Sequence, residues 1–196
     1  MLSTAAIDEL SKRIALYEDI KAYEKLYQFM FEQIYRFSLS IVKSEETAEE
    51  IVSDVFIKLW QIRAKLPEIG NLKVYLFTIA KNFSINYIHQ NYKNVPCSLE
   101  EMHTEPQISM GNPEELCISA ETIKKLQLLV RELPPQCRLI FQLVKENGLK
   151  YKEVAEVLGI SSLTVRNQLA IAVRKLAAAL PLQDKISAQI VSLTAS

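Results

Sequence analysis

The sequence has few glycines, cysteines and histidines, and each shortage excludes a class of fold or site. Four glycines and three cysteines occur among its 196 residues. So few glycines, together with few runs of alternating polar and apolar residues, predict an all-helical (all-α) fold. Cys97, Cys117 and Cys137 are far apart and form no C-x-x-C pair, and only two histidines could assist them. We therefore expect reduced thiols, with no bound metal and no other cofactor.

Long apolar runs are also missing. Asp8 and Glu9 stand where a signal peptide would need an apolar core. No stretch of the sequence approaches the roughly 20 apolar residues of a membrane span. The sequence therefore predicts a cytoplasmic protein that does not insert into a membrane.

Neither sign of charge dominates, because 23 basic residues balance 23 acidic ones. Hydrophobic residues make up 49% of the chain, which is ample for the cores of one or two domains. A neutral protein holds DNA poorly by itself, since sequence-independent affinity comes mainly from neutralised phosphates. A DNA-binding role would therefore need another molecule to supply much of the affinity.

Residues 150–178 have the pattern of a helix-turn-helix motif. Counted from Tyr151, Ala155, Gly159 and Val165 occupy the fifth, ninth and fifteenth positions. This spacing places a small residue where two helices cross, a glycine free to take φ > 0 in the turn, and a β-branched anchor beneath the second helix. We expect the second helix to lie in a major groove of DNA.

The second helix of this motif separates into two faces at 3.6 residues per turn. The positions that we predict to be buried are Val165, Leu169, Ala172, Val173 and Leu176. Those left available to DNA are Leu163, Thr164, Arg166, Asn167, Ala170 and Arg174. Arg and Asn carry the hydrogen-bonding groups that read guanine and adenine edges, and Ser161 can cap the start of the helix. The alternative is an ordinary helical hairpin inside an α-bundle.

The first half of the chain predicts three helices, over residues 17–42, 45–63 and 72–90. In the first, aromatic and aliphatic residues recur every three or four positions, as one core-facing stripe requires. That stripe comprises Tyr23, Leu26, Tyr27, Met30, Ile34, Phe37 and Ile41. In the third, the predicted buried stripe is Leu72, Leu76, Ile79, Ala80, Phe83 and Tyr87.

The second of these helices has more apolar surface than one core face needs. Its inward stripe is Ala48, Ile51, Val52, Val55, Leu59 and Ile62. Phe56, Ile57 and Trp60 fall partly or wholly outside it, beside acidic residues. This combination suggests a docking surface for a basic partner. The alternative is that a neighbouring helix covers these three side chains.

A polar and aromatic ladder follows one edge of the third helix. Its members are Tyr75, Thr78, Asn82, Asn86 and His89, spaced by three or four residues. Residues 63–93 contain five basic residues and one acidic residue. A positive field around such a ladder suits a single nucleic-acid strand with splayed bases. The alternative is an amphipathic helix with a hydrated border.

The remaining segments divide the chain into domains. We predict an N-terminal extension over 1–16, a helical domain over 17–92, a flexible acidic linker over 93–112, a second helical domain over 113–181 and a tail over 182–196. Asn112 and Pro113 begin a predicted helix that reaches Leu133. A further helix from Gln136 to Glu146 precedes Asn147-Gly148, which predicts a left-handed cap.

Two of these segments carry a resemblance to a known family. Residues 48–60, AEEIVSDVFIKLW, and the pattern of Tyr75, Leu76, Ile79, Ala80 and Asn82 resemble regions 2.2 to 2.4 of bacterial sigma-70 factors of the extracytoplasmic-function (ECF) group. The helix-turn-helix with Thr164-Val165-Arg166 resembles region 4.2. The match covers about residues 17–180 in the right order. The resemblance also fits the neutral charge, because RNA polymerase core helps to hold the promoter in that family.

The resemblance implies three sets of site residues. Those expected on the melted −10 strand of promoter DNA are Leu66, Pro67, Gly70, Asn71, Lys73, Tyr75, Thr78, Asn82, Asn86 and His89. Those expected on −35 duplex are Ser162, Thr164, Arg166, Asn167, Gln168 and Arg174. Those expected on RNA polymerase core are Glu49, Glu50, Ser53, Asp54 and Ile57. The family also implies an anti-sigma factor as a partner, commonly one that spans the membrane.

Two other functions remain as alternatives. A repressor or activator could use the same motif to bind duplex DNA as a dimer, and it would bind its operator without polymerase. An enzyme is the third class. The sequence shows no nucleophile paired with a base, no metal-ligand cluster and no glycine-rich phosphate loop, so it predicts no catalytic activity.

Overall fold

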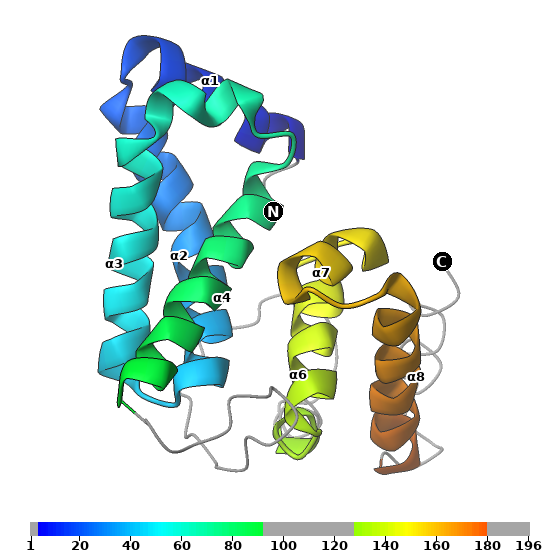
Figure 1. The fold of residues 1–196 in the computed structure, drawn as a ribbon. Coiled ribbons are helices and arrows are strands. Elements are labelled where there is room, and N and C mark those ends of the chain that lie inside the picture. Colours follow the sequence, from blue (N-terminus) through cyan, green and yellow to red (C-terminus); the bar gives the residue numbers. More distant parts are fainter. Residues whose placement is uncertain (1–3, 92–127, 180–196) are drawn as a thin grey trace, which may run out of the picture.

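The computed structural model describes residues 4–91 and 128–179, and the regular elements in these ranges are all helices. The all-helical prediction is therefore confirmed for the described chain (Figure 1). The first range, here called the first unit, contains α1 (Thr4–Tyr17), α2 (Ile20–Val42), α3 (Glu45–Gln61), the 3₁₀ helix η1 (Arg63–Glu68) and α4 (Leu72–Asn91). The second unit contains α6 (Pro135–Phe141), the π-helix η2 (Gln142–Glu146), α7 (Tyr151–Leu158) and α8 (Ser162–Ala179).

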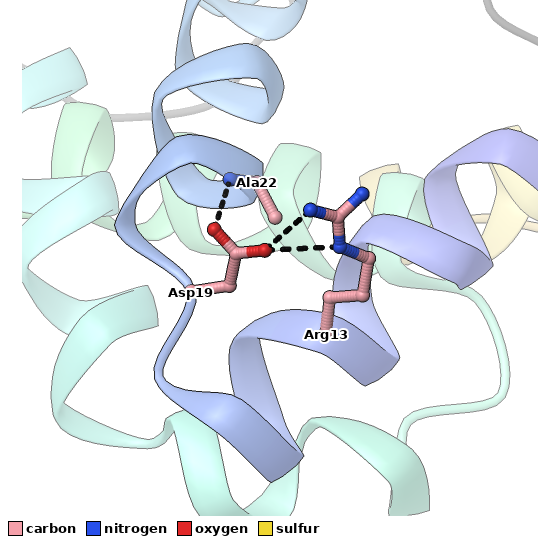
Figure 2. A network of polar contacts seen from close by, with 3 residues as sticks. All are labelled: Arg13, Asp19 and Ala22. Carbon is pink, nitrogen blue, oxygen red and sulfur yellow. Dashed lines mark hydrogen bonds and ion pairs between the residues drawn. The ribbon is translucent and has the colours of Figure 1, made fainter.

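The helix predicted over 17–42 begins three residues later than expected. Glu18 takes a left-handed conformation, with φ of 48°, and this ends α1 before α2 starts. Asp19 then caps α2, because its Oδ1 accepts a hydrogen bond from the backbone N–H of Ala22 at 3.1 Å (Figure 2). The Arg13 guanidinium of α1 binds its other oxygen. Both interactions hold the pKa of Asp19 below its usual value, and the hydrogen bond from the Ala22 backbone has the larger effect.

Helix α2 is central in the first unit and packs against α1, α3 and α4. Five members of its predicted stripe are fully buried: Leu26, Met30, Ile34, Phe37 and Ile41. The other two, Tyr23 and Tyr27, are half-buried and contact Phe56 of α3 with their rings. Helix α1 joins this core through Ile7, Leu10 and Ile14, so the residues predicted as an N-terminal extension are part of the first unit and pack on α2.

Helix α3 begins at the Ser44 cap, whose hydroxyl accepts a hydrogen bond from Thr47 N–H at 3.3 Å. Its inward stripe is buried as predicted, apart from Ile62, which is half-buried. The Phe56 side chain is also buried, and the centroid of its ring lies 4.6 Å from that of Tyr27. The Tyr23 hydroxyl donates a hydrogen bond to the Phe56 carbonyl oxygen. The alternative of coverage by a neighbouring helix thus holds for Phe56.

The predicted stripe of α4 is only partly right. Leu72, Leu76 and Ala80 are buried, but Ile79, Phe83 and Tyr87 are only half-buried. The remaining fully buried residues of α4 are Val74, Phe77, Ser84 and Ile88. The reason is that α4 packs against α2 and α3 on one side and α7 on another, so a single stripe cannot describe it.

The second unit follows the predicted order. The helix expected over 136–146 is present as α6 and η2, and Gly148 after it has φ of 69°. Gly159 has φ of 72° in the turn between α7 and α8. Ser161 caps α8, because its hydroxyl accepts from Thr164 N–H at 3.0 Å. Both predicted left-handed glycines and the predicted cap are confirmed.

The two units are packed together in this structure. One cluster of buried side chains extends from Ile7 in α1 to Val173 in α8, and α4 packs against α7. A smaller cluster within the second unit comprises Leu133, Cys137, Ala172 and Leu176. None of the helices in residues 4–91 and 128–179 combines the length and apolar content that crossing a bilayer requires. The predicted linker over 93–112, most of the predicted helix over 112–133 and the tail over 182–196 lie outside the described residues.

Candidate nucleic-acid interface

The helix-turn-helix is formed by α7 and α8, joined by a turn at Gly159. Two backbone hydrogen bonds close this turn, from Gly159 N–H and Ile160 N–H to the Ala155 carbonyl, at 2.9 and 3.1 Å. The predicted core face of α8 is buried in full: Val165, Leu169, Ala172, Val173 and Leu176. The opposite face of α8 therefore remains free to meet DNA.

That exposed face carries most of the residues predicted for −35 duplex. Ser162, Arg166, Asn167 and Arg174 are exposed, and Thr164 is half-buried. Leu163 is also exposed, at 57%. Exposed Arg and Asn side chains on one helix face have the donors and acceptors for base edges in a major groove.

Gln168 is the exception, because its side chain turns toward α6. Its Oε1 accepts a hydrogen bond from the Cys137 thiol, with a sulfur–oxygen distance of 2.8 Å. Burial raises the pKa of that thiol above its ordinary value, with an opposing effect from Lys175, so the thiol stays a donor. In this conformation the Gln168 amide oxygen already has a partner within the protein, and its assignment to −35 duplex stays a prediction. Helical spacing could not reveal the contact, because Cys137 is 31 residues away.

The ladder of α4 lies at the surface as predicted. Asn82, Asn86 and His89 are exposed, whereas Tyr75 and Thr78 are half-buried. The Thr78 hydroxyl donates to the Val74 carbonyl at 2.9 Å, which uses its one hydrogen and leaves the two lone pairs of its oxygen as acceptors. The end of α4 thus presents two amides and an imidazole to solvent.

The segment before α4 differs from the predicted loop. Residues 63–68 form the 3₁₀ helix η1, and Leu66 is only 1% exposed, so its side chain is not available for a contact in this conformation. Its apolar side chain is part of the shared core. Pro67 and Gly70 are exposed, and a Cβ built at Gly70 would meet nothing within 4 Å. Gly70 therefore has open space beside it, and Pro67 lies at the surface.

Asn71 and Lys73, also predicted for DNA, are bound by the second unit. The Asn71 amide donates to Glu153 Oε1 at 3.0 Å, and the Lys73 ammonium donates to the Asn147 carbonyl at 2.6 Å. Burial lowers the pKa of Lys73, and the nearby Glu153 carboxylate opposes that effect. In this conformation each side chain makes one such hydrogen bond, and helical spacing could not predict either, because the partners are 82 and 74 residues away.

The outer face of α3 carries the residues predicted for polymerase. All five are exposed: Glu49, Glu50, Ser53, Asp54 and Ile57. Ile57 is 54% exposed, whereas Trp60 is half-buried against Tyr23, with ring centroids 5.1 Å apart. The Arg63 guanidinium lies 5.0 Å from the Trp60 ring. An apolar side chain among carboxylates is therefore available, as the docking hypothesis requires.

Comparison with models of known protein families identifies the family of this chain. The model described as Sigma-70 region 2 matches residues 23–93, and the model described as Sigma-70, region 4 matches residues 123–176. Together they cover more than half of the chain. The chain belongs to the sigma-70 family. The relatives below place it among factors of the ECF type.

Three curated sigma-70 relatives are similar over most of the chain. The ECF RNA polymerase sigma factor SigM of Bacillus subtilis is 26% identical over 74% of this chain and 87% of its own length. The ferric citrate uptake sigma factor FecI of Escherichia coli is 29% identical over 67% and 75%. SigL of Mycobacterium tuberculosis is 25% identical over 89% and 92%.

Two solved structures share the fold of this sigma-70 protein. The sigma factor RpoE of Bartonella quintana, solved with the anti-sigma factor NepR, has a TM-score of 0.62 at 17% identity, over 84% of this chain and 99% of that one. CnrH, solved with the cytosolic domain of CnrY, has a TM-score of 0.57 at 18% identity, over 91% and 99%. Both likenesses concern the fold.

Proposed function

We propose that this sigma-70 protein binds RNA polymerase core in the cytoplasm and directs promoter-specific initiation of transcription. The observation that carries the proposal is that two exposed helix faces of different chemistry lie on one chain. The α8 face presents exposed Arg and Asn side chains in a helix-turn-helix, which suits duplex DNA. The α4 face presents exposed amides and an imidazole, which suit unpaired bases. A protein that only binds duplex DNA has no use for the second face.

On the −35 duplex, Arg166, Asn167 and Arg174 would contact base edges and phosphates. All three are exposed, and Ser162 stands at the start of the same helix. The exposed N-terminal turn of α8 also offers backbone N–H groups to a phosphate. This contact would fix the position of the protein along the promoter.

At the −10 element, the ladder of α4 would hold one strand after melting. Unstacking a base costs a few kcal/mol, and stacking together with hydrogen bonds in a pocket offset that cost. Asn82 and Asn86 would supply hydrogen bonds to base edges, and Tyr75 a ring for stacking. Pro67 and Gly70, exposed just before the start of α4, would border this surface.

The exposed face of α3 would dock on polymerase. Glu49, Glu50 and Asp54 provide negative charge, and Ile57 provides an apolar contact at its centre. Polymerase would then supply much of the binding to promoter DNA, which a chain of net charge zero lacks. An anti-sigma factor is a further proposed partner, because both solved neighbours are described in complexes with partner proteins.

Asn82→Ala tests the −10 assignment. Purified core enzyme and the full chain are first assayed on a promoter library, and promoter opening is followed by permanganate reactivity of −10 thymines. We expect Asn82→Ala to bind core normally but to reduce that reactivity, because one base contact is lost. Gln28→Ala, an exposed amide on α2, is the matched control. Reactivity equal to that of the unaltered chain would exclude Asn82 from the site.

Core dependence separates this function from the alternative of a conventional repressor or activator. That alternative predicts tight operator binding by the chain alone, whereas our proposal predicts promoter-selective RNA synthesis only with core enzyme. RNA synthesis that is equally selective without this chain would overturn the proposal.

A further inference from the structure

Lys43 lies where the end of α2 meets α6 of the second unit. It follows the last residue of α2 in a left-handed conformation, with φ of 62°, and its side chain is half-buried. Helix α2 packs against α6, and the charge that acts on the Lys43 ammonium is the Arg138 guanidinium of α6. Glu45 and Glu46, the acidic residues closest in sequence, are exposed at the start of α3. Among the described residues, the Lys43 ammonium has neither a hydrogen-bond acceptor nor an ion-pair partner.

The Arg138 guanidinium is held in place by backbone carbonyls rather than by a carboxylate. Its Nη2 donates to the carbonyl oxygens of Arg131 and Leu133, the latter at 3.1 Å. Its Nε is buried and has no hydrogen-bond partner in the part of the chain that the structure describes. Because a carbonyl oxygen carries no formal charge, these contacts fix the guanidinium without neutralising it. Two cations from different units are therefore held close together.

This environment makes the Lys43 amine a better nucleophile at neutral pH. Burial, followed in size by the charge of Arg138, lowers the pKa of Lys43 from 10.5 to about 8. Near pH 7.5 roughly a quarter of the Lys43 amines are then neutral, against about one in a thousand at the ordinary pKa. A lysine that is desolvated, or that lies beside another cation, is activated for attack on carbonyl carbon.

Lys73 and Lys81 lack one part of this arrangement. Burial lowers the pKa of both. The Lys73 ammonium, however, donates to the Asn147 carbonyl at 2.6 Å, so it already has an acceptor. For Lys81 burial is the one cause of the lowered pKa, and no neighbouring cation contributes. Lys43 combines an amine without an acceptor with a fixed positive charge beside it.

We propose that Lys43 is a site of N-acylation by small acyl phosphates, of which acetyl phosphate is the simplest. The neutral amine attacks the acyl carbon, and an amide C–N bond forms as the C–O bond to phosphate breaks. Phosphate leaves with the electron pair of that bond, and the amine proton passes to water. An acyl phosphate is anionic, so the Arg138 guanidinium attracts the reagent and stabilises the leaving phosphate.

The product changes the contact between α2 and α6. Acylation removes the positive charge of Lys43, and with it the repulsion from Arg138. The supply of acyl phosphate is thereby coupled to the packing of α6 on α2. Lys43 belongs to none of the three sets of residues predicted to contact DNA or polymerase, so this site does not rest on the proposed function.

Site-resolved acetylation kinetics test the proposal on the full folded chain. The protein is treated with acetyl phosphate between about pH 6.5 and 9.5, and peptide mass spectrometry gives the initial rate at each lysine. At pH 7.5 we expect Lys43 to react at least about tenfold faster than Lys12, which is exposed on α1, and than Lys81. The gain is smaller than the gain in neutral amine, because a weaker base is a weaker nucleophile. The rate at Lys43 should level off above about pH 8.

Two further measurements isolate the role of Arg138 without altering the carbonyl contacts that it makes. Inorganic phosphate, added at constant ionic strength, should compete with the reagent and slow acetylation at Lys43 but not at Lys12. An uncharged reagent, p-nitrophenyl acetate, should favour Lys43 over Lys12 less strongly than acetyl phosphate does, because it has no phosphate for the guanidinium to attract.

Equal initial rates at Lys43, Lys12 and Lys81 would overturn the proposal. A preference for Lys43 that persists in the chain unfolded by guanidinium chloride would also do so, because it would not depend on the packing of α6 on α2. Inhibition by phosphate to the same degree at Lys43 and Lys12 would overturn the part assigned to Arg138. None of these measurements involves polymerase, so a failure of promoter-specific initiation would leave their outcome unchanged.

Discussion

At the scale of single residues, Lys43 shows how tertiary packing changes the pKa of a side chain. In the sequence, Lys43 is only the residue at which a predicted helix ends. It caps α2 in a left-handed conformation, with φ of 62°, and its N–H donates to the Leu39 carbonyl at 3.0 Å. Burial, with a smaller effect from Arg138 of α6, lowers its pKa from 10.5 to about 8. A desolvated ammonium close to a guanidinium destabilises the folded chain while it remains charged.

This pKa predicts a rise of stability with pH. Between about 8 and 10.5 the folded state binds fewer protons at Lys43 than the unfolded state, so the free energy of unfolding increases as pH rises through this window. We expect the free energy of unfolding of the unaltered chain to rise, relative to that of Lys43→Met, as the pH increases from 8 to 10. Urea unfolding at several pH values measures it. A difference that does not vary with pH would show that the ammonium is solvated.

At the scale of elements, the turn of the helix-turn-helix depends on one backbone conformation. Gly159 has φ of 72°, and a Cβ built on it would meet nothing within 4 Å. The need for glycine is therefore conformational rather than steric. For this reason the spacing of Ala155, Gly159 and Val165 was enough to predict the motif.

Gly159→Ala should lower the free energy of unfolding by about 1 kcal/mol, because an L-residue is strained in the left-handed region. Gly70→Ala is the matched control, since Gly70 also has open space but no positive φ. Urea unfolding followed by circular dichroism compares the two variants. Equal stabilities would mean that the turn relaxes to another conformation at little cost.

At the scale of the whole molecule, the two units share one buried cluster. Val154 of α7 is fully buried in that cluster, whereas Trp60, the single tryptophan of the chain, belongs to α3. A shared core couples the unfolding of the two units. Fluorescence of Trp60 therefore reports on the second unit as well as on its own.

We expect Val154→Ala to reduce the free energy of unfolding by roughly 2 kcal/mol, through lost burial and the cavity left behind. The urea transition seen by Trp60 fluorescence should shift to lower concentration together with the transition seen by circular dichroism. Arg174→Ala, on the exposed face of α8, should leave both transitions in place. A Trp60 transition that does not move would indicate independent units.

The sequence by itself determined the two helices of the helix-turn-helix, the Ser161 cap, the left-handed glycines and the buried face of α8, because these follow from residues a few positions apart. Ser161, Gly148 and Gly159 act on their own turns. The exposure of the acidic α3 face and of Asn82, Asn86 and His89 was likewise predictable from helical period.

Only the tertiary structure decided which of the residues predicted to contact DNA are buried or already hydrogen-bonded within the protein. Leu66 is buried, Gln168 binds Cys137, and Asn71 binds Glu153 from 82 residues away. The stripe of α4 was predicted only in part for the same reason, since α7 covers a second side of that helix. Periodicity shows which residues share a face, but the partner of that face depends on how distant helices pack.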